Sequence, residues 1–309
     1  MRACPMADAI DAVAAGFVAL SDGRAHVPVR IGAPIEQGGS THAMPATLDG
    51  SAYFCVKIVA VAPGARTRGV PLINATVLLG DAVTGVPLAI IEGASLTGLR
   101  TGAAGGVAAR ALAPEDASVL ALYGAGAQAG TQLDAVLAVR PIAEVRVVTR
   151  DPHHADDFAA WARARYPEVR VVVAGSGEAL DGAAVVVTAT SSPVPVFAGD
   201  RLGPGVHVTA VGAFRPETRE LDAATMRGAR IVVDQRAGAL HEAGELQGLG
   251  PGDVVEIGEV LAETVPGRTS TDERTVFKSV GNGIQDLVVA SLAYERALAL
   301  GLGEEIHWP

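Results

Sequence analysis

The residues with the clearest chemical use form a glycine-rich turn in the middle of the chain. An apolar run at 118–123 leads into Gly124-Ala-Gly126-Ala-Gln-Ala129, and helix-forming residues continue to about Val139. Glycine at 124 permits a sharp turn, glycine at 126 lets backbone N–H groups approach a pyrophosphate, and a small residue at 129 lets helix and strand pack closely. With a second strand at 144–149, the pattern predicts dinucleotide binding rather than a purely structural turn, by Gly124, Gly126, Ala127, Gln128 and Ala129.

The end of the second strand bears on which dinucleotide binds. Proteins that bind NAD commonly carry Asp or Glu there, because a carboxylate accepts hydrogen bonds from the ribose 2′-hydroxyl. This chain has Thr149 and Arg150 instead. A guanidinium can pair with a 2′-phosphate, so the sequence predicts a preference for NADPH, with NADH also accepted. The alternative is an ordinary solvated arginine after a strand.

Several isolated polar residues are also candidates. Lys57 lies in an apolar strand, where an ammonium is costly to bury without an anion, unless it reaches water at the strand edge. His42 is a candidate proton donor, with a structural histidine as the alternative. Asn74 begins a formal glycosylation sequon, but we expect it near the nicotinamide. The segment His241-Glu-Ala-Gly-Glu245 lacks the second histidine of H-E-x-x-H, so we expect no metal site.

Length and composition indicate a globular protein without a polyanionic partner. The 309 residues are 49% hydrophobic, which allows a large core in two domains. A net charge of −10 disfavours binding to nucleic acids and anionic membranes. Cys4 and Cys55 are too few for a disulfide framework, and Pro5 interrupts the N-terminus before an apolar signal core could form. We therefore expect a soluble, cytoplasmic protein.

The order of the expected elements indicates two domains of different architecture. A helix at 7–20 precedes strands too closely spaced for helices between them, at 26–31, 41–44, 53–61, 72–79 and 87–92. A helix at 95–113 leads to strands that alternate with helices, near 118–123, 144–149, 169–174, 184–189, 206–211 and 230–234. This alternation predicts an α/β fold, a Rossmann doubly wound parallel sheet at 113–283. A last helix at 284–300 should return to a sheet-rich domain built from both termini, 1–112 together with 284–309.

Further motifs occur in a definite order along the chain. They are Cys55-Val-Lys-Ile-Val59, Ala75-Thr-Val-Leu-Leu79, Arg100-Thr101, the turn at Gly124, Val211-Gly-Ala-Phe-Arg-Pro-Glu-Thr-Arg-Glu-Leu-Asp222, Val233-Asp234 and Thr275-Val-Phe-Lys-Ser279. Together they resemble the ornithine cyclodeaminase and mu-crystallin family, over nearly the entire chain. The resemblance implies a homodimer, with a sheet-containing substrate-binding and dimerisation domain joined to a Rossmann domain, acting on a small amino or imino acid.

The resemblance also implies roles for individual residues. Arg30, Lys57 and Arg100 match positions that bind the substrate carboxylate or take part in catalysis. Met44 matches a turn that shapes the substrate pocket. Cofactor contacts are implied for Thr101, the loop from Gly124 to Ala129, Thr149, Arg150, Thr188, Ala189, Thr190, Lys278 and Ser279.

Position 214 indicates which reaction of the family to expect. Ornithine cyclodeaminases carry an aspartate at the matching position, where it serves in proton transfer, whereas this chain has Phe214. A phenyl ring cannot accept a proton; it either packs against the substrate ring or fills the core. The segment therefore resembles the reductase branch, which reduces Δ1-pyrroline-2-carboxylate and Δ1-piperideine-2-carboxylate to proline and pipecolate.

Such a reduction needs an arginine fork for the carboxylate and a proton or hydrogen bond for the imine nitrogen, because the cofactor carries the hydride. Three alternatives stay open. They are an ornithine cyclodeaminase with another base, an open-chain alanine or N-methyl amino acid dehydrogenase, and a non-catalytic protein that holds NADPH.

Overall fold

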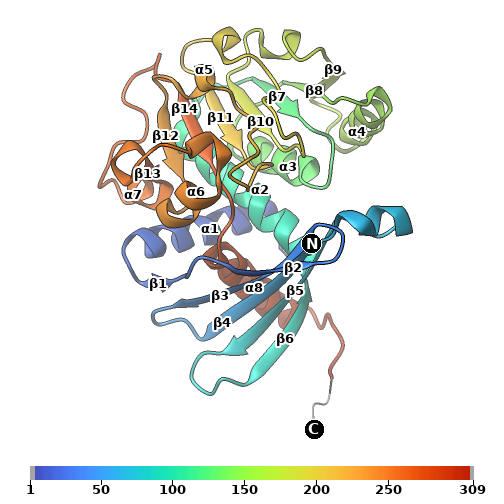
Figure 1. The fold of residues 1–309 in the computed structure, drawn as a ribbon, viewed down its shortest axis with the longest axis vertical. Helices are drawn as coiled ribbons and strands as arrows, with labels where there is room; N and C mark the ends of the chain where they lie inside the picture. Colours follow the sequence, from blue (N-terminus) through green and yellow to red (C-terminus); the bar gives the residue numbers. More distant parts are fainter. Residues whose placement is uncertain (1–3, 307–309) are drawn as a thin grey trace. The chain divides into compact units, whose positions relative to one another are not determined.

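Two compact units make up the chain, Met1–Arg100 with Asn282–Pro309 and Thr101–Gly281 (Figure 1). The computed structural model describes residues 4–306. Residues 1–3 and 307–309, which include the start of the expected N-terminal segment and the end of the expected first domain, lie outside this range. No helix within residues 4–306 is both long enough and apolar enough to cross a membrane.

The first unit consists of an antiparallel sheet with helices. Its elements are α1 (Met6–Ser21), β1 (Ala25–His26), β2 (Ile31–Ile35), β3 (Gly39–Leu48), β4 (Tyr53–Val61), a 3-10 turn (Pro63–Arg68), β5 (Ile73–Asp81), β6 (Pro87–Glu92), the start of α2 (Gly93–Leu112) and α8 (Gly283–Ala299). The 6-stranded sheet has the order β1-β3-β4-β5-β6, with β2 paired to β3. The expected return of the last helix to this sheet is confirmed, because α8 packs on β3, β4, β5 and α1.

Pro28 divides the strand that we expected at 26–31. β1 ends at His26 and β2 begins at Ile31, and both pair with β3. Proline has no N–H for a ladder hydrogen bond and also restricts the residue before it. The expectation of one continuous strand is therefore wrong. Arg30 lies directly before β2 as a result.

The sheet of the first unit has one covered and one open face. Side chains alternate along β4, and Cys55 and Lys57 point toward α8, where they contact Gly283 and Asp286. Four isoleucines share the opposite face, as the strand register shows, and are 72%, 38%, 57% and 60% exposed: Ile31, Ile35, Ile58 and Ile90. Clustered exposed apolar side chains are typical of surfaces that contact proteins, membranes or ligands.

The second unit is a parallel sheet with helices. Its elements are the rest of α2, β7 (Val119–Tyr123), α3 (Ala129–Val139), β8 (Glu144–Val148), α4 (Pro152–Arg165), β9 (Arg170–Val173), β10 (Val185–Thr188), β11 (His207–Ala210), α5 (Ala223–Met226), β12 (Arg230–Val233), α6 (Arg236–Glu242), β13 (Val255–Glu256), α7 (Ile257–Leu261) and β14 (Thr275–Lys278). Short 3-10 turns lie at Glu178–Leu180, Gly199–Arg201, Gly244–Leu246 and Pro251–Asp253. All strand pairs are parallel. The expected Rossmann class is confirmed.

Strand order in the second unit fixes the ligand-binding end of its sheet. The 8-stranded order is β13-β12-β14-β11-β10-β7-β8-β9, so β8 and β9 are added on one side of β7 and β10 on the other, and the switch point lies between β7 and β10. Ligands of open α/β sheets bind at the carboxyl ends of the strands beside such a switch point. β13 and β14 were not expected as strands. β14 is short and ends in Lys278, so no apolar run marks it, yet all four of its residues are buried.

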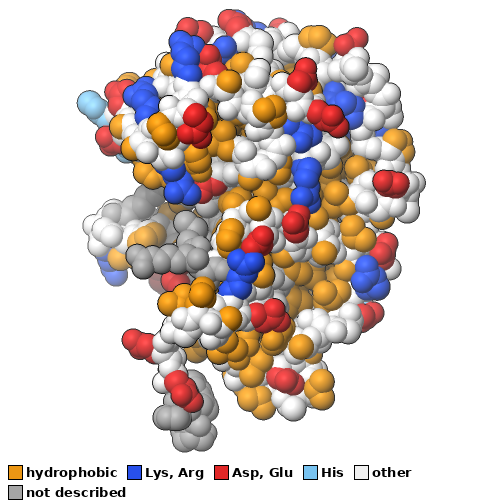
Figure 2. Space-filling view, turned by 180° about the vertical axis from the view of Figure 1, so that it is seen from behind, with side chains coloured by type: hydrophobic (Ala, Val, Ile, Leu, Met, Phe, Trp, Pro, Cys, Tyr) orange, Lys and Arg blue, Asp and Glu red, His pale blue; other side chains and the backbone are white. Residues whose placement is uncertain are grey.

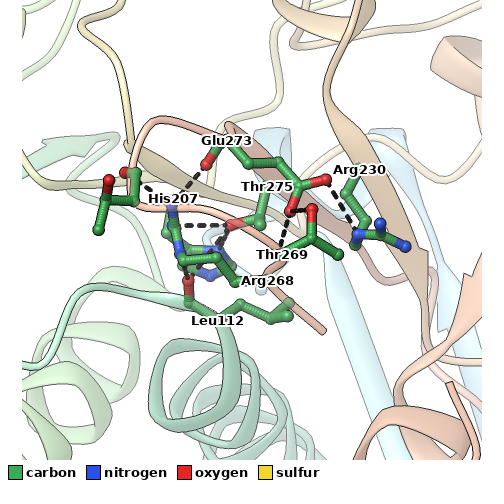
Figure 3. A network of polar contacts seen from close by, with 8 residues as sticks. Leu112, His207, Arg230, Arg268, Thr269, Glu273 and Thr275 are labelled. Carbon is green, nitrogen blue, oxygen red and sulfur yellow. Dashed lines mark hydrogen bonds and ion pairs between the residues drawn. The ribbon is translucent and has the colours of Figure 1, made fainter. Parts of the chain in front are cut away.

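A buried polar network ties the end of α2 to the region before β14 (Figure 3). His207 is fully buried, with Nδ1 2.9 Å from Thr275 Oγ1 and Nε2 3.0 Å from Thr209 Oγ1. Arg268 donates from Nε and Nη2 to the carbonyl of Leu112 at 2.9 and 2.7 Å. These two hydrogen bonds satisfy the carbonyl of Leu112, the last residue of α2, which a helix end leaves unpaired.

Charges of both signs are interspersed on the face of the molecule drawn in Figure 2. Red carboxylates neighbour blue basic groups over most of it, with hydrophobic side chains between them. The described residues of this face therefore form no extended basic stripe of the kind that binds nucleic acid.

Candidate active site

The turn after β7 has the backbone conformation that its glycines predict. Gly124 has a φ of +106°, and an added Cβ would lie 2.5 Å from the carbonyl oxygen of Ala189. The N–H of Gly124 donates to Val148 O at 2.8 Å, and the N–H of Ala189 donates to Tyr123 O at 2.9 Å. These bonds join the ends of β7, β8 and β10, so the turn is fixed at the switch point.

Gly126 and the start of α3 leave space and donors for an anion. A Cβ at Gly126 would meet no atom within 4 Å, so packing inside the protein does not require glycine there. Gly126 and Ala127 are exposed, Gln128 makes no side-chain capping hydrogen bond, and Ala129 is buried in the core. An uncapped helix N-terminus beside an unobstructed glycine suits a pyrophosphate. The residues present therefore fit a dinucleotide.

Thr149 and Arg150 follow β8 next to this turn. Thr149 Oγ1 donates to the carbonyl oxygen of Asp151, and Arg150 is exposed. The nearby acidic side chain of Asp151 is engaged as the N-cap of α4, where it accepts from the N–H of His153 at 3.0 Å. The loop thus presents a guanidinium rather than a free carboxylate.

Glu220 joins the loops that follow β10 and β11. Its carboxylate accepts from the N–H and hydroxyl of Thr190 at 2.7 and 2.8 Å, and from the N–H of Gly212 at 2.6 Å. Glu220 is fully buried, and a Cβ at Gly212 would lie 2.1 Å from Thr190 O. Phe214 is partly buried, with the Arg215 guanidinium carbon 5.9 Å from its ring centroid. Glu220 therefore fixes the segment that carries Phe214.

Other expected cofactor residues of the second unit are buried. The carbonyl of Thr101 accepts from Gln132 Nε2 at 2.9 Å, and Thr188 Oγ1 has no hydrogen-bond partner within residues 4–306. Lys278 Nζ lies 3.2 Å from Glu245 Oε2, with both side chains fully buried. Ser279 Oγ donates to Asp234 Oδ2 at 2.7 Å. The Lys278 and Ser279 side chains are thus engaged inside this unit, and a cofactor contact of either residue stays a prediction.

Lys57, Arg100 and Asp286 form a buried ion cluster in the first unit. Lys57 Nζ lies 2.9 and 2.8 Å from Asp286 Oδ1 and Oδ2, and Arg100 Nε lies 3.1 Å from Oδ1. Arg100 Nη1 donates to Gln285 Oε1 at 2.6 Å. The side chains of Lys57, Arg100 and Asp286 are only 1%, 8% and 0% exposed. Two cations and one carboxylate leave a surplus positive charge, which is costly to bury unless an anion binds.

The cluster changes the acidity of Lys57. Burial is the main cause that lowers the pKa of this ammonium from 10.5 to about 8; Arg100 and Arg30 also lower it, and Asp286 raises it. Lys57 and Lys278 are the only lysines in the sequence, and each is buried beside a carboxylate. Every other Lys or Arg position of the chain is arginine, whereas these two positions carry the compact, titratable ammonium of lysine.

The remaining expected residues of the first unit divide between its two sheet faces. Met44 pairs with Lys57 across β3 and β4 and is buried, so the expectation that it lies in a turn is wrong. His42 lies one pair further along the same face, with Nε2 3.0 Å from Ser40 Oγ. Asn74 does not join them, because Lys57 pairs with Val77 and alternation turns Asn74 to the opposite face. There it is exposed and donates to Pro71 O at 2.8 Å.

Asp286 and Gln285 were missed by the sequence analysis. They lie in the first turn of α8. An acidic residue there usually has a simpler role, which is to stabilise the helix by interacting with the positive end of its dipole. Lys57 provided the missing signal, since a lysine inside an apolar strand requires a carboxylate partner. The sequence gives no means of choosing which one.

Comparisons with known proteins cover both units. The model of the ornithine cyclodeaminase/mu-crystallin family matches residues 1–301. A Δ1-pyrroline-2-carboxylate reductase of Bacillus cereus is 37% identical over 294 residues, 92% of this chain and 90% of the relative.

Two solved structures are also similar. One is Thermococcus litoralis Δ1-pyrroline-2-carboxylate reductase in complex with NADH and L-proline, with a TM-score of 0.94 and 36% identity, covering 98% of this chain and 96% of that one. The other is an archaeal alanine dehydrogenase dimer with bound NAD, with a TM-score of 0.93 and 36% identity, covering 99% and 95%. The family expected from the motifs is confirmed. The chain belongs to the ornithine cyclodeaminase/mu-crystallin family.

Proposed function

We propose that this protein reduces a small cyclic imino acid with a reduced nicotinamide dinucleotide. The observation that carries the proposal is the buried surplus of positive charge at Lys57, Arg100 and Asp286, because it calls for a small anion. The similar proteins of Bacillus cereus and Thermococcus litoralis are named Δ1-pyrroline-2-carboxylate reductases. The substrate in that name is a ring with one C=N bond and one carboxylate, and it is therefore a small anion.

The first unit would bind the substrate. Arg100 and Lys57 would receive the carboxylate, and Arg30 adds positive charge near Lys57. As C2 of the imine accepts a hydride, the electron pair of the C=N bond moves to nitrogen, which must carry or gain a proton. Lys57 and His42, on the covered face of the sheet, are the groups we propose for that proton.

The second unit would bind the dinucleotide. Its pyrophosphate would lie at Gly126 and the first N–H groups of α3, and Thr188 and Thr190 line the other side of the switch point. When bound, the reduced nicotinamide supplies the hydride. Phe214 offers no carboxylate for the elimination of ammonia, so reduction is favoured over cyclodeamination.

NADPH is the dinucleotide that we propose as preferred. Arg150 is exposed beside the nucleotide-binding turn, and the carboxylate of the next residue, Asp151, caps α4. Arg150→Ala should lower kcat/KM for NADPH about tenfold or more and leave that for NADH nearly unchanged, because a charged hydrogen bond is lost with the 2′-phosphate alone. An unaltered ratio of the two values would refute the preference.

A homodimer is the proposed assembly. The open sheet face carries Ile31, Ile35, Ile58 and Ile90, and the similar archaeal alanine dehydrogenase is a dimer. A second copy of the chain would remove these side chains from water.

The decisive experiment follows oxidation of NADPH and NADH by absorbance with Δ1-pyrroline-2-carboxylate or Δ1-piperideine-2-carboxylate. Oxidation of NADPH or NADH with either cyclic imine supports the proposal, and no oxidation with either of them contradicts it. Pyruvate with ammonia or methylamine tests the open-chain alternative, which the likeness to alanine dehydrogenase favours second. Ammonia release from ornithine tests cyclodeamination, and dinucleotide binding without any turnover would indicate a binding protein.

A further inference from the structure

We infer that Asp286 is a positioning residue for carboxylate recognition. From the first turn of α8, it holds Lys57 and Arg100 so that unused N–H groups of both side chains face one carboxylate. This inference rests on the proposed function, and it assigns a role to a residue that neither the sequence motifs nor the comparisons single out.

The contacts of Asp286 leave donors over on both cations. Lys57 Nζ has three N–H groups, and its two contacts are to the two oxygens of Asp286. Arg100 Nη1 donates to Gln285 Oε1, whereas Nε lies 3.1 Å from Asp286 Oδ1 as an ion pair and has no hydrogen-bond partner within residues 4–306. The two cations therefore keep donors that a bidentate carboxylate can fill.

Asp286 also sets how much charge is left for the ligand. Lys57 and Arg100 together carry two positive charges, and the Asp286 carboxylate neutralises one of them. The other attracts a monoanion into a site that is almost completely buried. Without Asp286 the two cations would repel each other, and no fixed group would hold them side by side.

The start of α8 has further buried polar side-chain atoms without a hydrogen-bond partner within residues 4–306. Gln285 Nε2 and both polar atoms of the Asn282 side chain have no hydrogen-bond partner within residues 4–306, although Gln285 is 0% and Asn282 4% exposed. Asn282 is the N-cap of α8 and makes no side-chain capping bond. Two unpaired buried donors and one unpaired buried acceptor, so close together, indicate a polar ligand that both accepts and donates hydrogen bonds.

The test measures binding of pyrrole-2-carboxylate by calorimetry, with the protein saturated with NADP+. This probe is a flat ring whose carboxylate lies beside the ring nitrogen, and it is not turned over with NADP+, which has no hydride to donate. Asp286→Asn should weaken its binding at least about 30-fold, since one member of a buried charge cluster is lost. Pyrrole-2-carboxamide, which has no charge, should bind the variant and the native protein within about threefold of each other.

Asp8→Asn is the control, because Asp8 forms a partly exposed ion pair with Arg296 that joins α1 to α8 away from the cluster. It should leave both probes unchanged. Asp286→Glu separates charge from packing. If charge positioning matters, Glu should bind the carboxylate probe better than Asn does; if Asp286 only fills space, the isosteric Asn should be better.

The outcomes distinguish this inference from the proposed function. If the native protein neither binds pyrrole-2-carboxylate nor oxidises NADPH or NADH with the cyclic imines, the proposed function fails. If it does both and Asp286→Asn binds the probe with native affinity, the inference alone is overturned.

Should Asp286→Asn not fold, Gln285→Met removes the acceptor of Arg100 Nη1 without burying a new charge. A loss of about fivefold or more supports the inference, and native affinity there overturns it.

Discussion

Lys57 illustrates what a single residue indicates in the sequence alone and what the structure adds. Its position in an apolar strand indicates a buried ammonium, and the structure confirms the burial. Its partner is 229 residues away in the chain, so no local pattern relates the two. The sequence therefore predicts that a counter-charge exists, and only the packing of α8 on β4 identifies Asp286.

Binding of the carboxylate probe should depend on pH through Lys57. The pKa of Lys57 is lowered to about 8, so the ammonium is present below that pH and lost above it. Affinity for pyrrole-2-carboxylate should be constant from pH 6 to 7 and then fall about tenfold per unit above pH 8. Calorimetric titrations from pH 6 to 9.5 would measure this. Lys57→Arg, which stays charged throughout, should remove the bend; the same bend in that variant would assign it to another group.

At the scale of elements, the turn after β7 contains two glycines from which we expect different effects: Gly124 is needed for stability, and Gly126 is needed for dinucleotide binding. Gly124→Ala should destabilise the second unit by at least about 1–3 kcal/mol, because it combines a φ of +106° with a contact to Ala189 O. Gly126→Val should leave the melting temperature nearly unchanged, since its Cβ space is empty, but should abolish tight dinucleotide binding. Thermal melts and fluorescence titration with NADPH separate the two effects. Native dinucleotide affinity in Gly126→Val would contradict the assigned pyrophosphate site.

His207 makes the second unit sensitive to acid. Burial lowers its pKa from 6.5 to about 3, with smaller contributions from Arg268 and Arg140. Below pH 6.5 the His207 side chain binds a proton in the unfolded chain but not in the folded chain. The free energy of unfolding is therefore highest above pH 6.5 and decreases as the pH falls toward 3. At pH 5 the loss amounts to about 2 kcal/mol. Urea unfolding at pH 5 and 7 should show a smaller difference in His207→Gln than in the native protein; equal differences would exclude His207 as the cause.

Elements with a strong repeating pattern were predicted well, and those without one were not. β4 and β6 match their expected bounds because apolar runs end at clear turn residues. β13 and β14 lack such runs. β14 is held between β11 and β12, and its terminal lysine is tolerated only because Glu245 lies beside it. In the same way, the nucleotide turn was predicted from local glycines, whereas the ion cluster required tertiary contacts.

At the scale of the whole molecule, the open isoleucine face predicts the assembly. Ile58→Glu should convert a dimer into monomers, because a charge at the centre of an apolar interface cannot be hydrated there. Light scattering during gel filtration would measure the mass. Val83→Glu is the control, since Val83 is 91% exposed in the turn between β5 and β6, away from the strands of that face. A native protein that is monomeric at micromolar concentration would refute the dimer.

The uncompensated charge beside Asp286 also affects how a catalytic cycle would finish. An imino acid that enters with a bare ring nitrogen carries one negative charge overall, and it is attracted by this cluster. A hydride and one proton convert it to a secondary amine that still carries one negative charge; when that amine takes up a second proton from water, the amino acid carries an ammonium as well as a carboxylate, and its overall charge is zero. Electrostatic attraction thus weakens once the second proton is taken up, and departure of the saturated ring is then easier than departure of the unsaturated one.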